Sequence, residues 1–396
     1  MTTALNDIRV FDLSSFMAGP VCGMFLGLMG AEVIRMETPG GGVDRSWGML
    51  VPDGENLGFK IYARNKKFIT LALKTKKGKE MFSKLVRHSD VVLHNFIPGS
   101  SLANEVAYDA LEKINPKVIV AALSAYGQSG PYSERVGLDF AIQAHSGAMM
   151  MNGFPGDPPT KANVPYIDYA SGLSAALGVL GALKYREKTG AGQAVDVSLF
   201  DTAFFLTQSM GELVFYEMYD RVKKQLGNSG FSAYQTCVEA KDGMVMITPS
   251  TPSIWKRFTE VIGSKELTEN PKFATDMDRA ENCSLIDQIV EDWARQRTVA
   301  EVVTMLQKAR VPAAPVVGVD ELVNDAHVKT RGMITDARVP GYDRVSLPGI
   351  PIKLSKTRME ITSPAPQLGE HNVEIYNGLL GFSLDEIDEL QREHVI

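Results

Sequence analysis

The stretch IRVFDLSSFMAGPVCGMFLGLMGAEVIRME, residues 8–37, decides the fold because it predicts a strand, a helix and a second strand in succession. Residues 8–14 are β-branched and apolar, as is typical of a strand. Gly19-Pro20 indicates the start of a helix, because proline is tolerated in the first helical turn. Gly30 indicates its end, and residues 31–37 predict the next strand.

The same alternation continues toward the middle of the chain. The pattern predicts strands at 68–73, 90–96 and 117–126 and helices at 77–88 and 107–115. Such alternation is typical of a parallel sheet with helices on both faces, which places the chain in the α/β class. Ligands of such sheets bind at the carboxyl ends of the strands. The candidate ends here are Ser14-Ser15, Glu37, Asn95-Phe96 and Ser124–Tyr126.

The character of the sequence changes near residue 225, which predicts a second, smaller α+β domain. A hairpin is expected around Lys241-Asp242-Gly243, followed by helical segments to about residue 310. Residues 311–317 are predicted to lead back toward the first domain. We therefore expect a large domain at 1–200, a linker at 201–226, a small domain at 227–318 and a C-terminal return at 319–396.

Composition limits the classes of function. A net charge of −6 in 396 residues argues against general affinity for nucleic acids. The three cysteines (Cys22, Cys237 and Cys283) show no disulfide or zinc spacing, and the six histidines form no HxxxH pair, so we expect no metal site. The apolar run at 173–183 is shorter than the roughly 20 residues that cross a bilayer. We expect a soluble cytoplasmic protein without a membrane partner.

One carboxylate has an unusual setting. In VPYIDYASGLSAALGVLGALKYREKTG, residues 164–190, Asp168 precedes a long run of small apolar residues, and the nearest charges are Lys161 and Lys184. Asp is a preferred N-cap residue, although no Glu or Gln follows three positions later to complete a capping box. The alternative is a reactive carboxylate in a dry environment. These residues alone leave both interpretations open.

A basic stretch at 60–79 is the second candidate site. It holds Lys60, Arg64, Lys66, Lys67, Lys74, Lys76, Lys77 and Lys79 before the first acid, Glu80. In an acidic protein this stretch can attract the phosphates of a cofactor. It can equally be a solvated turn and helix start.

With these segments in view, the chain resembles the family III coenzyme A transferases, which include formyl-CoA, carnitine and bile-acid CoA-transferases. The resemblance is carried by RVFDLSSFMAGP (9–20), GAEVIRMETPGGGVDR (30–45), DVVLHNFIPG (90–99), SAYGQSGPYSERVGLDF (124–140) and the stretch around Asp168, in the family's order along nearly the whole chain.

The resemblance implies an enzyme that moves coenzyme A from an acyl-CoA to a free carboxylic acid, with Asp168 as nucleophile. Its intermediates would be an aspartyl anhydride and an aspartyl-CoA thioester. It implies a Rossmann-like large domain, a smaller α+β domain and an interlocked homodimer. The positions that match CoA contacts in the family are Ser15, Phe16, Met17, Ala18, Leu71, Lys74, Asn95, Phe96 and Tyr126.

Two other functions stay open. An α-methylacyl-CoA racemase shares this fold but carries a histidine where Gly137-Leu138-Asp139 has leucine, and leucine cannot move a proton. A non-catalytic CoA-binding protein is the second alternative. Met17 stands where formyl-CoA enzymes have glutamine, and the apolar Phe16 and Tyr166 favour an acid bulkier than formate or oxalate. The sequence does not identify the acyl-CoA donor or the acceptor acid, or tell inter- from intramolecular transfer.

Overall fold

The computed structural model describes residues 3–52, 54–339 and 342–396, which form two compact units. The first unit comprises residues up to 148, 162–213 and 329–396. The second comprises residues 149–161 and 214–328. The domain boundaries expected from the sequence follow another criterion, a change in residue pattern, and stay predictions.

A six-stranded parallel sheet is the framework of the first unit, with the order β3-β2-β1-β4-β5-β6. The strands are β1 (Arg9–Asp12), β2 (Glu32–Glu37), β3 (Lys66–Thr70), β4 (Val91–His94), β5 (Ile119–Ser124) and β6 (Ala194–Ser198). The α/β class predicted from the sequence is confirmed. The order reverses between β1 and β4, and in open parallel sheets ligands bind at the carboxyl side of such a reversal.

Strand β3 differs from its prediction in a way that has a physical cause. It spans Lys66–Thr70, whereas the apolar pattern predicted 68–73. The ammonium group of Lys66 is fully buried and lies 2.8 Å from a carboxylate oxygen of Asp12. The strand therefore begins with a charged residue whose partner lies 54 positions away, and an apolar pattern cannot find such a residue.

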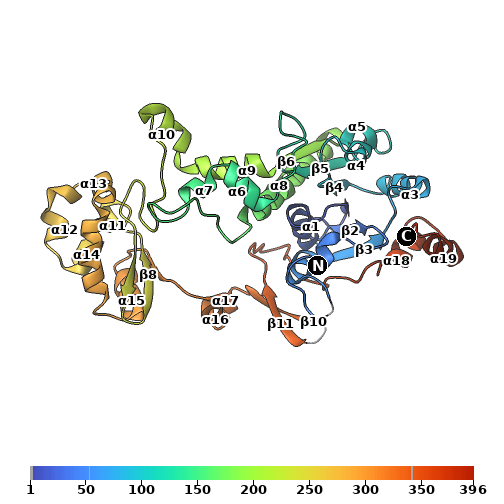
Figure 1. Cartoon of the computed structure of the whole chain (residues 1–396). Helices are drawn as coiled ribbons and strands as arrows, with labels where there is room; N and C mark the ends of the chain where they lie inside the picture. The colour runs from blue at the N-terminus through green and yellow to red at the C-terminus, as the bar shows by residue number, and fades with distance from the viewer. Residues whose placement is uncertain (1–2, 53, 340–341) are drawn as a thin grey trace. The chain divides into compact units, whose positions relative to one another are not determined.

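Helices cover both faces of the sheet (Figure 1). On one face, α1 (Ala18–Leu28), α8 (Tyr166–Thr189) and α9 (Leu199–Thr207) pack with strand residues such as Val10 and Val33. On the other, α3 (Lys76–Val86), α5 (Tyr108–Leu111), α18 (Asn372–Gly378) and α19 (Leu384–Arg392) pack with Phe11 and Ile34. Neighbouring residues of one strand thus point to opposite cores, as a pleated strand requires.

Short elements and one hairpin complete the first unit. They are η1 (Val43–Arg45), α2 (Leu57–Tyr62), α4 (Ser101–Glu105), α6 (Asp139–His145), η2 (Gln208–Met210), β10 (Ile334–Val339) and β11 (Tyr342–Pro348). Strands β10 and β11 pair antiparallel. Three helices carry the chain across the boundaries between units: α7 (Ala148–Met151), α10 (Glu212–Tyr219) and α17 (Ala326–Thr330).

The second unit contains a small antiparallel sheet and a group of helices. The sheet has the order β7-β8-β9, with β7 (Thr236–Ala240), β8 (Gly243–Ile247) and β9 (Ala313–Pro315). The helices are α11 (Pro252–Ile262), α12 (Glu266–Glu269), η3 (Pro271–Phe273), α13 (Asp276–Glu281), α14 (Cys283–Ala294), α15 (Val299–Lys308) and α16 (Val319–Leu322). The predicted hairpin is present, but the expected return at 311–317 is wrong, because this segment supplies β9 of the small sheet.

Helix α8 is longer than its apolar run predicted. It has 24 residues and is the one helix in the described ranges whose length and hydropathy would allow it to cross a membrane. Its buried residues, among them Ile167, Ala175 and Val179, belong to the core that also contains Val10 and Val33 of the sheet. The packing identifies α8 as a core helix of the first unit.

Helices α1 and α8 approach closely at one glycine. A Cβ atom built on Gly172 would lie 2.6 Å from the backbone oxygen of Ala18 and 2.7 Å from a methyl carbon of Val21. A backbone oxygen at the start of α1 cannot move aside without moving the helix. Gly172 therefore sets the distance between the two helix starts.

We expect Gly172→Ala to destabilise the protein by about 1–3 kcal/mol, the usual cost of forcing an extra carbon into a packed core. Gly378→Ala on α18 is the control, because a Cβ there meets nothing within 4 Å and this helix lies outside the proposed dimer interface. The control should be neutral or up to about 1 kcal/mol more stable, through higher helix propensity. Urea unfolding of both variants measures the difference, and equal stabilities would contradict the close approach.

Candidate active site

Asp168 lies in the first turn of α8, but it does not cap this helix. The helix begins at Tyr166, and its N-cap residue, Pro165, offers no side-chain acceptor. A carboxylate oxygen of Asp139 accepts hydrogen bonds from the backbone N–H of Ile167 at 2.8 Å and of Asp168 at 3.0 Å. The capping interpretation of Asp168 is therefore wrong, since Asp139 occupies that role from a distant part of the chain.

Asp139 is itself held in place by Gln143, one turn further along α6. The Gln143 side-chain N–H₂ donates to the second Asp139 oxygen at 2.6 Å, and the Gln143 oxygen accepts the N–H of Ala162 at 2.9 Å. The side chains of both residues are buried. This network joins α6 to the segment that precedes α8. The Asp168 carboxylate takes no part in it.

The environment of Asp168 changes its titration. Burial raises the pKa of Asp168 to about 7, and the negative charge of Asp139 adds to the rise. Among the residues that the structure describes, none donates a hydrogen bond or forms an ion pair with the Asp168 side chain. An ordinary carboxyl has a pKa near 4. At neutral pH a part of the Asp168 population therefore carries a proton.

Asp168 lines a small cavity of about 80 Å³ together with several residues that the sequence predicted. Phe16, Met17 and Ala18, at the start of α1, form one side, and Asn95 follows strand β4. The rest of the wall is Leu123, Ser124, Ala125, Gly137, Leu138 and Leu199. This cavity brings a carboxylate and the N-terminus of a helix into one mostly apolar space.

A second, larger cavity of about 440 Å³ lies at the ends of β1, β2 and β3. Its lining includes Ser15, Leu71, Lys74 and Phe96, four further residues proposed to contact CoA. Tyr126 lines neither cavity; its hydroxyl lies 3.0 Å from a ring nitrogen of His145. The proposed contact residues therefore divide between two cavities, with Tyr126 outside both.

Asn95 connects the two strands where the sheet order reverses. Its side-chain oxygen accepts the N–H of Ser15 at 3.0 Å, and its N–H₂ donates to the Ser15 carbonyl at 2.8 Å. The side-chain oxygen and the side-chain nitrogen of Asn95 are thus both engaged by the β1–α1 connection. These two bonds indicate that Asn95 positions this connection.

The basic stretch at 60–79 is mostly neutralised by nearby carboxylates. Ion pairs engage Lys60, Lys66, Lys67, Lys77 and Lys79. Among the eight basic residues of the stretch, Lys74 is the one in the lining of the larger cavity. The stretch therefore offers a phosphate group a single cation at this cavity.

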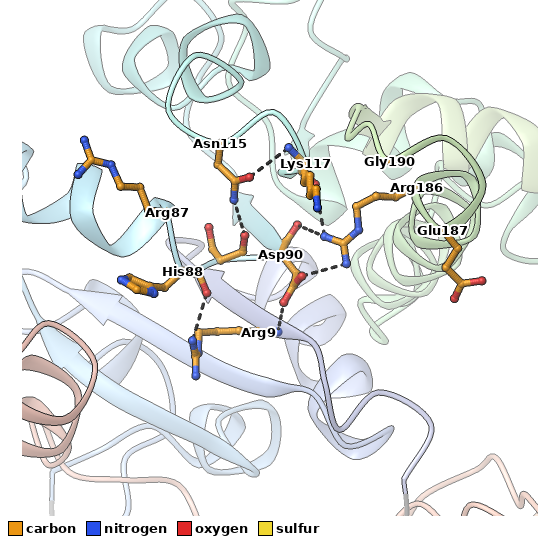
Figure 2. A pocket seen from close by; sticks show the side chains of 10 residues that line it. Arg9, Arg87, His88, Asp90, Asn115, Lys117, Arg186, Glu187 and Gly190 are labelled. Atoms are coloured by element: carbon orange, nitrogen blue, oxygen red, sulfur yellow. Dashed lines mark hydrogen bonds and ion pairs between the residues drawn. The ribbon is translucent and has the colours of Figure 1, made fainter.

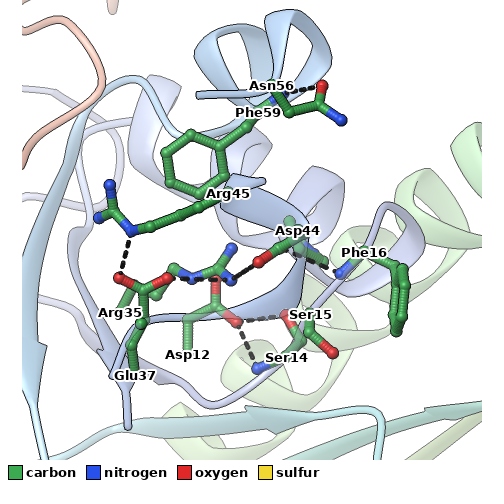
Figure 3. Close-up of polar contacts among 12 residues, drawn as sticks. Asp12, Ser14, Ser15, Phe16, Arg35, Glu37, Asp44, Arg45, Asn56 and Phe59 are labelled. Carbon is green, nitrogen blue, oxygen red and sulfur yellow. Dashed lines mark hydrogen bonds and ion pairs between the residues drawn. The ribbon is translucent and has the colours of Figure 1, made fainter. Parts of the chain in front are cut away.

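Three functional neighbours were not singled out from the sequence: Asp139, Arg35 and Asp44. The N–H of Phe16 donates to Asp44 at 3.1 Å, and Arg35 donates to both oxygens of Asp44 (Figure 3). Asp44 and Asp139 lie within the motifs GGGVDR and GLDF, which carried the family resemblance. Their contacts with the site, to the N–H groups of Phe16, Ile167 and Asp168, join residues that are 28 or 29 positions apart, so local pattern gives no signal for them.

The chain is similar to known proteins along nearly its whole length. The profile of CoA-transferase family III matches residues 5–372. The succinyl-CoA–D-citramalate CoA-transferase of Chloroflexus aurantiacus is 33% identical over 398 residues, covering 99% of this chain and 98% of that protein. The formyl-CoA:oxalate CoA-transferase of Streptomyces avermitilis is 32% identical over 414 residues, covering each chain completely. A crystal structure of a CaiB/BaiF family protein from Brucella suis superposes with a TM-score of 0.82 at 30% identity, covering 96% of this chain and 100% of that one.

The raised pKa of Asp168 makes the free energy of unfolding depend on pH. The folded protein keeps Asp168 protonated up to about pH 7, whereas the unfolded chain releases this proton near pH 4. Between these values the folded state binds more protons, so its stability falls as pH rises through this window.

We expect Asp168→Asn to be more stable than the wild type at pH 8, by about 2–4 kcal/mol at 1.36 kcal/mol per pKa unit. The difference should vanish toward pH 4, where both side chains are neutral. Urea unfolding at pH 4, 6 and 8 measures it. A difference that stays constant across this range would show that the Asp168 pKa is not raised.

Proposed function

This chain belongs to CoA-transferase family III, and from that premise we propose that Asp168 is the nucleophile that carries acyl groups and coenzyme A in turn. The observation that supports this proposal is the free carboxylate of Asp168 in one cavity with the start of α1. Because Asp139 accepts the N–H groups at the start of α8, Asp168 has no structural bond to break before it reacts.

The first half of the reaction transfers the acyl group to the enzyme. An ionised Asp168 oxygen attacks the thioester carbonyl carbon of the acyl-CoA, and the carbon–sulfur bond breaks. Coenzyme A leaves as a thiolate, and a mixed anhydride remains on Asp168. The thiolate then attacks the aspartyl carbonyl carbon, releases the first acid as a carboxylate and leaves an Asp168–CoA thioester.

The second half runs in the opposite direction with another acid. The acceptor carboxylate attacks the aspartyl carbonyl of the Asp168–CoA thioester, and the thiolate leaves again. That thiolate attacks the acyl carbonyl of the new anhydride, which releases the new acyl-CoA and returns Asp168 as a carboxylate. Every bond broken is balanced by one formed, so no other energy source is required.

Each addition creates a negatively charged oxygen that needs hydrogen-bond donors. The backbone N–H groups of Ile167 and Asp168 are already engaged by Asp139 and are not available. The first N–H groups of α1 have no acceptor within the helix, because the first turn of any helix lacks one. We assign the stabilisation of the oxyanion to this helix start at Met17 and Ala18.

The larger cavity supports a site for the rest of coenzyme A. Its volume of about 440 Å³ and its lining by Leu71, Lys74 and Phe96 suit an apolar arm and one anionic group. Ser15 connects this cavity to the wall of the smaller one through its neighbour, Phe16. Tyr126 remains in the proposed set, with its hydroxyl engaged by His145.

The two alternative functions lose support at specific residues. Leu138, which replaces the histidine of a racemase, lines the cavity beside Asp168 and offers no group that moves a proton. A non-catalytic CoA-binding protein has no use for a partly buried carboxylate that has no hydrogen-bond partner among the described residues and shares a cavity with the start of α1. Cytoplasmic location and the absence of nucleic-acid and membrane partners remain part of the proposal.

We also propose that a second copy of this chain covers the exposed apolar residues of α8 and α9. Leu173 and Leu177 lie on one face of α8, and Leu177 and Phe205 are 71% and 77% exposed. In α10, whose residues are all described, no side chain is buried. Exposed apolar groups of this number mark an interface, and the family resemblance implies a homodimer.

The reaction itself is tested with purified protein and a panel of acyl-CoA donors with mono- and dicarboxylic acids. We expect CoA exchange with at least one pair, and at least a 10³-fold loss of rate in Asp168→Asn, because the amide is not a nucleophile. Hydroxylamine quenching and peptide mass spectrometry should find the covalent adduct on Asp168. An adduct on another residue, or undiminished exchange in the variant, would disprove the mechanism.

Oligomeric state is tested by light scattering after gel filtration. We expect a mass of twice the 43.3 kDa of the chain. Leu177→Glu should shift the protein toward the monomer, because it places a charge on the proposed interface. Leu384→Glu is the matched control at another exposed leucine, 60% exposed on α19, and should leave the mass unchanged. A monomeric wild type would refute the dimer.

A further inference from the structure

The backbone of Phe16 has an unusual conformation at the proposed active site. Its φ angle is +64°, in the left-handed region that residues other than glycine seldom adopt. Phe16 lies between β1 and α1, lines the cavity of Asp168 and precedes Met17, the N-cap residue of α1. Strained residues persist only where their surroundings hold them, and they gather at functional sites.

The contact that holds Phe16 is a buried ion pair. The N–H of Phe16 donates to one Asp44 oxygen at 3.1 Å, and an Arg35 nitrogen donates to both Asp44 oxygens at 2.8 and 2.7 Å (Figure 3). The side chains of Arg35 and Asp44 are each 1% exposed. Charged groups buried to this degree are costly unless they are paired, so the arrangement has little freedom to change.

The surroundings restrict the pair further. The Arg35 guanidinium lies 5.5 Å and 5.6 Å from the ring centres of Phe59 and Phe68. Gly42 leaves the space that Asp44 occupies, because a Cβ there would lie 2.6 Å from an Asp44 oxygen. The position of Asp44 is thus fixed from the β2 side and from the loop side.

We propose that Asp44, held by Arg35, is a positioning residue that keeps Phe16 in its left-handed conformation and so directs the start of α1 toward Asp168. This inference rests on the proposed function, because it assigns to the α1 start the role of oxyanion donor. Without the Asp44 carboxylate, Phe16 relaxes to a negative φ, and the N–H groups of Met17 and Ala18 rotate. The step that suffers most is the attack of Asp168. Arg35 also lines the larger cavity proposed for coenzyme A, so the direct test changes Asp44 and keeps Arg35.

Asp44→Asn is the direct test, because it keeps the shape of the side chain and removes its charge. We expect kcat to fall at least tenfold with less than a threefold change in KM for the acyl-CoA. The rate at which the Asp168 adduct forms, measured by rapid quenching, should fall by the same factor as kcat. If this variant folds poorly, Arg35→Lys tests the same pair through the rate of adduct formation alone, because Arg35 lines the larger cavity and KM can change with it.

Asp90→Asn is the matched control at the amino end of the same sheet. Asp90 also accepts a backbone N–H, from Arg9 at 2.8 Å, and pairs with an arginine, Arg186, at 2.9 Å (Figure 2). This variant should lose stability with less than a twofold change in kcat. If Asp44→Asn and Asp90→Asn lower kcat equally at equal loss of stability, Asp44 has only a structural role and the proposal is wrong.

Phe16→Gly separates the positioning role from other effects of Asp44. Glycine adopts positive φ without steric cost, so its conformation depends less on the Asp44 contact. In the Phe16→Gly background, Asp44→Asn should lower kcat by less than threefold; a loss as large as in the wild-type background would overturn the proposal. An adduct found on another residue in the wild type would instead refute the proposed function, while the coupling between positions 44 and 16 would still report on the contact.

Discussion

The reversal of strand order between β1 and β4 is the constraint on which the rest of the site depends. From β1 the chain continues toward β2 at one side of the sheet, and from β4 it continues toward β5 at the other side. The connections that follow β1 and β4 therefore diverge and leave room at the carboxyl edge. Asn95 spans this point and binds both backbone groups of Ser15. Because of this bridge, the loop after β1 lies beside β4, where the cavity of Asp168 forms.

Local pattern predicted the α/β class and most strands, because alternation of strands and helices is a local property of the sequence. It failed where a residue takes its role from a distant partner. Lys66 begins β3 because Asp12 neutralises it in the core. Asp168 was a candidate helix cap because no other side-chain acceptor is close to it in the sequence. The residue that accepts the N–H groups at the start of α8 is Asp139, 29 positions before Asp168. The position of a residue along the chain gives no information on either partner.

The candidate site, like the fold, was predicted in part: the residues that line the cavity were found, and the charged residues that hold them were not. The family resemblance selected Phe16, Met17, Ala18 and Asn95, and the structure places them around Asp168. The resemblance did not select Asp139, Arg35 and Asp44, the charged residues that hold the start of α1 and the start of α8. Phosphate binding by the basic stretch was left open for the same reason, because the carboxylates that neutralise most of it lie elsewhere, Glu393 opposite Lys77 among them. Residues that line a cavity occur in recognisable motifs, whereas the charges that hold them are defined only by the folded chain.

Asp139 and Asp168, the two carboxylates near the start of α8, differ in how many hydrogen bonds stabilise their negative charge. This difference suits the proposed reaction. Asp139 receives two backbone N–H groups and a side-chain amide, whereas Asp168 receives none in the described part of the chain. Ionised Asp168 is therefore a poorly stabilised anion, which the raised pKa reports. Both covalent intermediates, the anhydride and the thioester, are neutral at this side chain. Attack thus moves the negative charge from the poorly stabilised Asp168 carboxylate through the oxyanion to the departing thiolate, so the side chain itself no longer carries it.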